Sequence, residues 1–177
     1  MTQVFSHKFM QQNRGCYSFD QLMSCSFMKN EPVTLESILK SEIRLNDKFW
    51  FLCKKVVTKE ENQEMAIFVA DLVLPIYEKR YPENKAPREA IEAARSYIAG
   101  HINLDELIKK RRAAADAAAA AYAYAAAAAY AAYAAADAAA AAYSAYAAYS
   151  AYAAAADESY TSKLEQYLYS FIEKAPV

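Results

Sequence analysis

The chain has 177 residues, enough for one domain with a substantial core. Its 20 Lys and Arg residues almost balance 21 Asp and Glu residues, so the net charge of −1 provides no overall attraction to nucleic acid or to an acidic membrane. Only two glycines and five prolines occur, which disfavours a sheet with many tight turns and predicts an all-α protein.

The cysteines and the first residues of the chain both indicate the cytoplasm. Cys16, Cys25 and Cys53 form an odd, scattered set with no CxxC motif and no histidine at metal-ligand spacing. Such a set is typical of a reducing compartment and argues against a disulfide framework or a zinc site. The first eight residues lack the apolar stretch of a signal peptide. We therefore expect a cytoplasmic protein without disulfides, metals or other cofactors.

The first half of the chain contains a weakly patterned start and then three clear helix signals. We expect residues 1–30 to form an N-terminal arm with one short helix within Phe19–Phe27. Three helices should follow, each after a residue that can cap it: Thr34 before 35–44, Asp47 before 48–57 and Thr58 before 59–81. The third of them has apolar residues on nearly all sides, so it should be the central core helix, and Pro75 should kink or divide it.

Two further helices lead into a tract rich in alanine. Pro87 suits a first helical position and Gly100 suits a helix end, which predicts a helix over residues 88–99. Asn103 is followed by two carboxylates and should open the next helix. From residue 113 to residue 156, 32 of 44 residues are alanine, and alanine has the highest helix propensity. The tract should therefore be helical.

Length indicates how the alanine tract, residues 113–156, is arranged. An unbroken helix of roughly 70 residues through the tract would be about 100 Å long, against about 40 Å for a compact domain of this size. A ten-residue sequence repeats after 21 residues, and Asp137 and Asp157 are suitable N-caps. We therefore predict a compact helical bundle over residues 31–177, in which the tract folds back as a helical hairpin. A capping-box pattern at Ser162 predicts a final amphipathic helix over residues 162–173.

The alanine tract is also long enough to cross a membrane, but its composition disfavours this. The charge-free windows 117–136 and 138–156 contain no Leu, Ile, Val or Phe, the residues that drive insertion. Asp137 would lie between the two spans and would cost a few kcal/mol if it were buried in lipid. We expect a soluble bundle with no membrane contact.

No catalytic motif occurs in the chain. Phosphate-binding loops, dinucleotide fingerprints, zinc-hydrolase motifs and nucleophile elbows are all absent. His7 and His101 lie in an arm and in a turn, where a surface role is commoner than a catalytic one. The basic run of residues 109–112 points in four directions on a helix, so nucleic acid is not an expected partner. The chain should not be an enzyme and should act by binding.

Candidate binding residues fall into three groups. Arg88, Glu92 and Arg95 share one helix face, where they can bind a carboxylate or phosphate or form an intrahelical salt-bridge ladder. Trp50 can anchor an interface or fill the core. Tyrosines of the alanine tract can form interface contacts or act as spacers between helices. The tyrosine candidates are Tyr122, Tyr130, Tyr133, Tyr143 and Tyr146.

Several segments, taken in order, carry a family resemblance. They are DKFWFLCKKV from Asp47, PREAIEAAR from Pro87, the alanine tract with its tyrosines and aspartates, and the short amphipathic tail. From about Leu35 to Phe171 the chain resembles the alanine-rich putative immunity proteins of bacterial and phage genomes. The resemblance implies a small helical protein without catalytic residues, and it transfers no site residues. Where many relatives use tryptophan or arginine in the tract, this chain uses tyrosine.

Three functions are compatible with these features. The first is a non-enzymatic inhibitor of immunity or phage counter-defence type that neutralises a protein toxin or a host defence factor. The second is a helical sponge for a small nucleotide signal, stacked between tyrosines and held by Arg88 and Arg95. The third is an ice-binding helical protein, which is disfavoured because the alanine tract contains no threonine. A monomer and a small closed homo-oligomer both fit the sequence.

Overall fold

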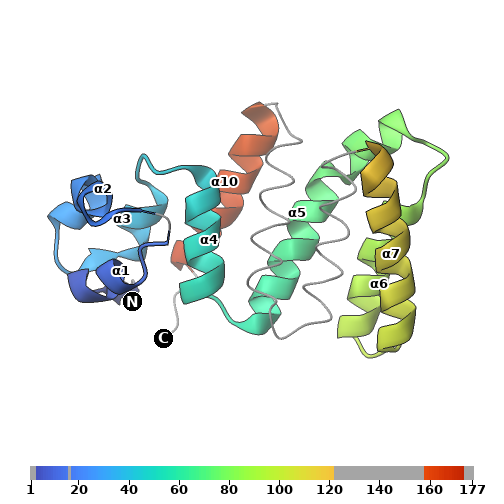
Figure 1. Cartoon of the computed structure of the whole chain (residues 1–177), viewed down its shortest axis with the longest axis horizontal. Helices are drawn as coiled ribbons and strands as arrows, with labels where there is room; N and C mark the ends of the chain where they lie inside the picture. The colour runs from blue at the N-terminus through green and yellow to red at the C-terminus, as the bar shows by residue number, and fades with distance from the viewer. Residues whose placement is uncertain (1–2, 16, 122–157, 174–177) are drawn as a thin grey trace. The chain divides into compact units, whose positions relative to one another are not determined.

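The computed structural model describes residues 3–15, 17–121 and 158–173 (Figure 1). It confirms the predicted all-α class, because the described residues form helices apart from loops and one pair of two-residue strands. Contacts divide the chain into two compact units. Unit 1 comprises Met1–Lys48 and Lys163–Val177, and unit 2 comprises Phe49–Ser162. The predicted division into an arm of residues 1–30 and a domain of residues 31–177 stays a prediction.

Unit 1 is built from short elements whose starts are fixed by side-chain caps. Ser6, Ser18 and Thr34 each accept a hydrogen bond from a backbone N–H in the first turn of the following helix. The strands β1 and β2 pair antiparallel in the register Val4 to Thr34 and Phe5 to Val33. The elements are β1 (Val4–Phe5), α1 (His7–Gln12), α2 (Phe19–Ser24), the 3-10 helix η1 (Ser26–Lys29), β2 (Val33–Thr34), α3 (Leu35–Leu39), the start of α4 (Leu45–Lys55) and most of α10 (Glu158–Glu173).

The core of unit 1 combines residues from both ends of the chain. Leu164 and Leu168 of α10 have no exposed surface, and neither has Leu39 at the end of α3. The remaining buried apolar residues of this unit include Met10, Leu22, Phe27, Met28, Val33, Leu35, Ile38, Leu45 and Phe171. The C-terminal helix is therefore an integral part of this core.

Several predicted boundaries in unit 1 are wrong, although the caps are in the expected places. Thr34 caps α3 as predicted, but the helix ends at Leu39 instead of residue 44. The helix α4 begins at Leu45, so Asp47 lies in its first turn and does not cap it. The carboxylate of Asp47 instead accepts hydrogen bonds from Tyr17 at 2.8 Å and from Arg44 at 2.9 Å. A distant partner, Tyr17, and a local one, Arg44, thus replaced the capping bond that the sequence predicted.

Unit 2 contains three consecutive helices, α5 (Lys59–Arg80), α6 (Ala86–Ile98) and α7 (Leu104–Ala121). The helix α6 packs against both α5 and α7, and short loops make each neighbouring pair antiparallel (Figure 1). Small buried residues of α6, Ala90 and Ala94, have no exposed surface, and the same is true of Ala114 on α7. Alanine at these positions lets the helices approach closely.

The predicted helix starts and ends of unit 2 are confirmed, but Pro75 does not divide α5. Thr58 forms a capping box at the start of α5, which is rich in buried residues and runs through Pro75 without being divided. Gly100, with φ of +74°, follows the end of α6, and its N–H donates to the carbonyl of Tyr97 at 2.9 Å. The side chain of Asn103 accepts a hydrogen bond from the N–H of Glu106 at 3.0 Å, which caps α7.

The C-terminal helix starts earlier than predicted, and most of the alanine tract lies outside the described residues. The helix α10 spans Glu158–Glu173 and already contains Ser162, so the predicted capping box at Ser162 is wrong. The helix α7 extends to Ala121 and confirms helix at the start of the tract. The predicted hairpin and its break at Asp137 fall outside the described residues. Within residues 3–15, 17–121 and 158–173, no helix is long and apolar enough to cross a membrane.

Candidate functional site

The densest charged surface of unit 2 lies on α6. Arg88, Glu89, Glu92 and Arg95 are exposed, and we refer to these four residues as the charged face of α6. The opposite side of the helix is buried against its neighbours through apolar residues, Pro87, Ala90, Ile91, Ala93 and Ala94. This division into one apolar and one charged side follows the helical period of the sequence.

Two ion pairs join the charged face of α6 to α5. The Nε and Nη2 atoms of Arg88 donate to the two carboxylate oxygens of Glu78 at 2.6 and 2.7 Å. The Nη2 atom of Arg95 donates to the carboxylate of Asp71. The Arg88 pair is bidentate, which is the strongest geometry for a guanidinium and a carboxylate. Both arginines are thus held by the neighbouring helix.

A third ion pair joins the same face to α7. Lys110 donates to the carboxylate of Glu89 at 2.7 Å. The three ion pairs thus engage three of the cations, Arg88, Arg95 and Lys110, with three carboxylates, Glu78, Asp71 and Glu89. Glu92 forms no ion pair with any residue that the structure describes.

The pairing shifts the titration of the groups involved but leaves the arginines accessible. The hydrogen bond from Arg88 holds the pKa of the Glu78 carboxyl below its usual value. The hydrogen bond and charge of Glu78 raise the pKa of Arg88, and the charges of Glu92 and Asp71 add to this effect. The side chains of Arg88 and Arg95 are 47% and 51% exposed. A guanidinium has five N–H donors, so each arginine retains donors for a partner.

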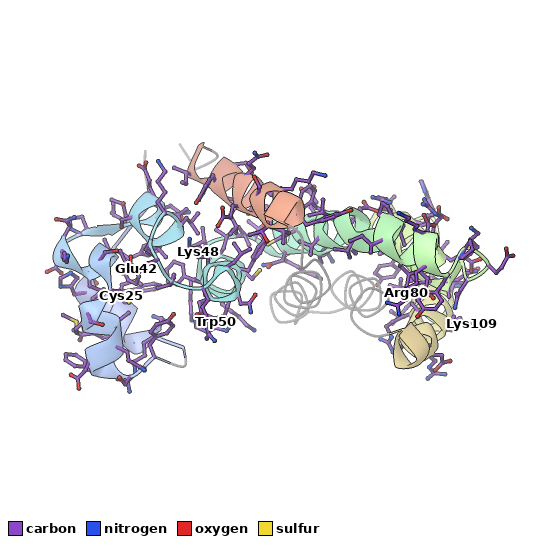
Figure 2. All side chains as sticks on the ribbon, turned by 90° about the horizontal axis from the view of Figure 1, so that it is seen from above. Cys25, Glu42, Lys48, Trp50, Arg80 and Lys109 are labelled. Carbon is purple, nitrogen blue, oxygen red and sulfur yellow. The ribbon has the colours of Figure 1, made fainter. Side chains whose placement is uncertain are left out.

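Trp50 does not lie on this face, and the tyrosine candidates cannot be compared with it. Trp50 is half-buried on α4, and α5 lies between α4 and α6 in both views (Figures 1 and 2). Tyr122, Tyr130, Tyr133, Tyr143 and Tyr146 lie outside the described residues. Of the three predicted groups, the structure therefore places Arg88, Glu92 and Arg95 together on α6, and the roles of all the candidates stay predictions.

Unit 1 contains a polar cluster around Lys48 that our sequence analysis did not identify. Lys48 on α4 is only 5% exposed, and burial lowers its pKa, whereas the charges of Glu165 and Glu42 raise it. Cys25, Glu42 and Lys48 lie in the same part of this unit (Figure 2). A signal was present in the sequence: Lys48 shares the helical register of the buried residues Leu45, Phe49 and Leu52.

Hydrogen bonds fix the other polar groups of the Lys48 cluster. The hydroxyl of Ser26 donates to Glu42 at 2.5 Å, and this bond chiefly lowers the pKa of Glu42 to about 2. Burial, together with the hydrogen bond to Asp47, raises the pKa of Tyr17 to about 12. The Cys25 thiol is buried, donates to the carbonyl of Gln21 at 3.3 Å and has a raised pKa. A thiol in such surroundings is inert, so the cluster has a structural character.

Neither disulfides nor metal sites occur in the described part of the chain. Cys25 and Cys53 are buried and form no disulfide, and Cys16 lies outside the described residues. No group of three or more His, Cys, Asp or Glu side chains within the described ranges is placed to hold a metal ion. The charged face of α6 is therefore the better candidate for a binding surface.

Comparison with known proteins gives one family. The model of the family described as Imm-5 like putative immunity protein matches residues 55–170, more than half of the chain and nearly all of unit 2. The search of curated proteins and the search of solved structures each gave no match. The charged face of α6 lies inside the matched region, whereas most of unit 1 lies outside it.

Proposed function

Because the chain belongs to the Imm-5 like putative immunity protein family, we propose that it is a non-enzymatic inhibitor that neutralises a protein toxin by binding it. The family description is that of an immunity protein, which implies a protein partner and a role without catalysis. The finer part of the proposal is that the charged face of α6 contacts the toxin. The observation that carries this part is a half-exposed row of charged side chains that neighbouring helices hold in fixed positions.

Fixed arginines favour binding to a folded protein. An arginine that is already ordered loses little side-chain entropy when a partner arrives, and arginine is enriched at interface hot spots. Glu78 and Asp71 hold Arg88 and Arg95 while about half of each arginine side chain stays exposed. Both arginines can therefore donate further hydrogen bonds to carboxylates or carbonyls of a partner without reorganisation.

The same geometry disfavours the alternative of a nucleotide sponge. A phosphate ligand would have to approach two guanidinium groups that already pair with carboxylates, on a helix face that also presents the exposed carboxylate of Glu92. Carboxylates so close to a phosphate would repel it. A protein surface that presents both signs of charge fits this face better than a polyanion does.

Neutralisation in cells tests the proposal. The chain would be co-expressed in a tester bacterium with each candidate toxin encoded in its source genome, and growth rescue would be scored. We expect rescue from one toxin and a stable complex of the two purified proteins. Absence of rescue from every toxin, together with release of a nucleotide at one copy per chain on denaturation, would support the sponge instead.

A double variant tests the surface. Replacing Arg88 and Arg95 with Gln should weaken toxin binding at least about tenfold, while each exposed pair contributes no more than about 1 kcal/mol to the free energy of unfolding. Glutamine is preferable to glutamate, which would face Glu78 and Asp71 and add like-charge repulsion. The matched control is Lys40→Gln, which breaks an exposed pair with Glu36 in unit 1. Full toxin binding by the folded double variant would remove α6 as the contact surface.

A further inference from the structure

Glu92 occupies an unexpected position on the charged face of α6. It lies four residues after Arg88 and three before Arg95, the two spacings at which opposite charges pair along an isolated helix. In the folded protein, Arg88 pairs with Glu78 and Arg95 pairs with Asp71. Glu92 is left exposed and without an ion pair to any described residue. The helix thus contains one acceptor whose local partners are already engaged.

Exposure and geometry favour Glu78 as the partner of Arg88. The side chain of Glu78 is only 22% exposed, whereas Glu92 lies on the exposed side of the helix. An ion pair with a less solvated carboxylate is less screened, and the bidentate contact adds a second hydrogen bond. Arg88 therefore pairs with Glu78, and Glu92 is left without an ion pair to any described residue.

We propose that Glu92 is the point at which the charged face of α6 receives a cationic side chain, lysine or arginine, from the protein partner. The inference deepens the proposed function and rests on it. A cation at Glu92 would neutralise the charge of its carboxylate. Carboxylate or carbonyl oxygens of the partner beside that cation would accept hydrogen bonds from the remaining N–H groups of Arg88 and Arg95. The charges of these two arginines are already balanced by their ion pairs with α5.

Carboxyl footprinting of the full chain tests whether Glu92 is available. Carbodiimide with glycine ethyl ester labels free carboxylates, and mass spectrometry locates the label. Glu64 on α5 is a matched reference, because it is exposed and forms no ion pair with a described residue. Glu92 should be labelled as fast as Glu64 and several-fold faster than Glu78. Labelling of Glu92 as slow as that of Glu78 would overturn the inference, because the carboxylate would then already be engaged.

Charge variants test the contact itself, with the toxin identified by growth rescue as the probe. Glu92→Lys should weaken binding about a hundredfold and Glu92→Gln about tenfold, whereas Glu64→Lys should bind like the wild type. The melting temperature of each variant shows whether it is folded. Wild-type binding by folded Glu92→Lys would overturn this inference and leave the proposed function intact. Failure of the wild-type chain to neutralise any toxin would overturn the proposed function and, with it, this inference.

Discussion

The two units of the molecule place their charges in opposite ways. In unit 2, charged groups line the exposed side of α6 and pair across it, while the contacts between helices are made by alanine and other apolar residues. In unit 1, an ammonium group, a thiol and a tyrosine hydroxyl lie in or near the core, beside carboxylates on loops and helices. Exposed pairs contribute little to stability, whereas buried charges strongly affect it. Substitutions of the exposed charges on α6 should therefore report on binding, whereas substitution of the buried Lys48 of unit 1 should report on folding.

The largest expected effect tests whether apolar packing, and not ion pairing, stabilises unit 2. Leu107 of α7 has no exposed surface, and replacing it with alanine should lower the free energy of unfolding by about 3 kcal/mol in urea titrations. Leu104→Ala, one turn earlier and 43% exposed, is the control and should cost less than about 0.5 kcal/mol. Similar losses for the two variants would contradict the assignment of stability to the buried side of these helices.

A smaller effect of opposite sign is expected at Lys48. Burial penalises its charged form, so Lys48→Met should increase the free energy of unfolding near pH 7 by on the order of 1 kcal/mol. The folded-state pKa is lowered, so the folded state binds fewer protons than the unfolded state. The stability of the wild type should therefore rise with pH toward the ordinary value of 10.5, and the difference from the variant should shrink.

The control for Lys48→Met is Lys40→Met, because Lys40 is exposed. This change should alter the free energy of unfolding by no more than about 0.5 kcal/mol, and it should show no comparable dependence on pH. Destabilisation by Lys48→Met at pH 7 would mean that attraction from Glu42 and Glu165 outweighs the cost of burial.

The smallest expected effect concerns the titration of Glu42. The Ser26 hydroxyl is the main cause of its low pKa, so Ser26→Ala should raise this pKa from about 2 toward the ordinary 4.5 in a carboxyl-resolved NMR titration. In the wild type, the stabilising contribution of Glu42 is complete above pH 4.5 and is lost as pH falls toward 2. In the variant the contribution should be smaller, and its loss should still begin near pH 4.5 but end at a higher pH than in the wild type. An unchanged pKa in Ser26→Ala would assign the shift to the backbone N–H of Ser26 instead.

The sequence was most informative where local signals determine structure. Thr34, Thr58, Pro87, Gly100 and Asn103 lie where their caps, turns and helix ends were predicted, because each acts through bonds to residues a few positions away. In unit 1 before α4, each helix has four to six residues and each strand has two. Such elements are too short to show a hydrophobic period in the sequence. This is why residues 1–30 resembled an arm.

The candidate site was predictable in its location but not in its pairing. Helical spacing placed Arg88, Glu92 and Arg95 on one exposed side of α6. The partners of the two arginines lie 10 and 24 residues away on α5, and no local rule connects such distant positions. The charge of Glu165 on α10 also acts on Lys48, although the two residues are far apart in the chain.

Unit 1 is built from two segments that are far apart in the chain, and this affects the order in which its parts are synthesised. Its first segment ends at residue 48 and its second begins at residue 163, so 114 residues are made between them. At about 5–20 residues per second, translation of this interval takes on the order of ten seconds. Throughout that time, unit 1 lacks its second segment, which includes the buried Leu164 and Leu168. Nascent unit 1 is therefore a natural client for chaperones, whereas α5, α6 and α7 can pack as soon as they leave the ribosome.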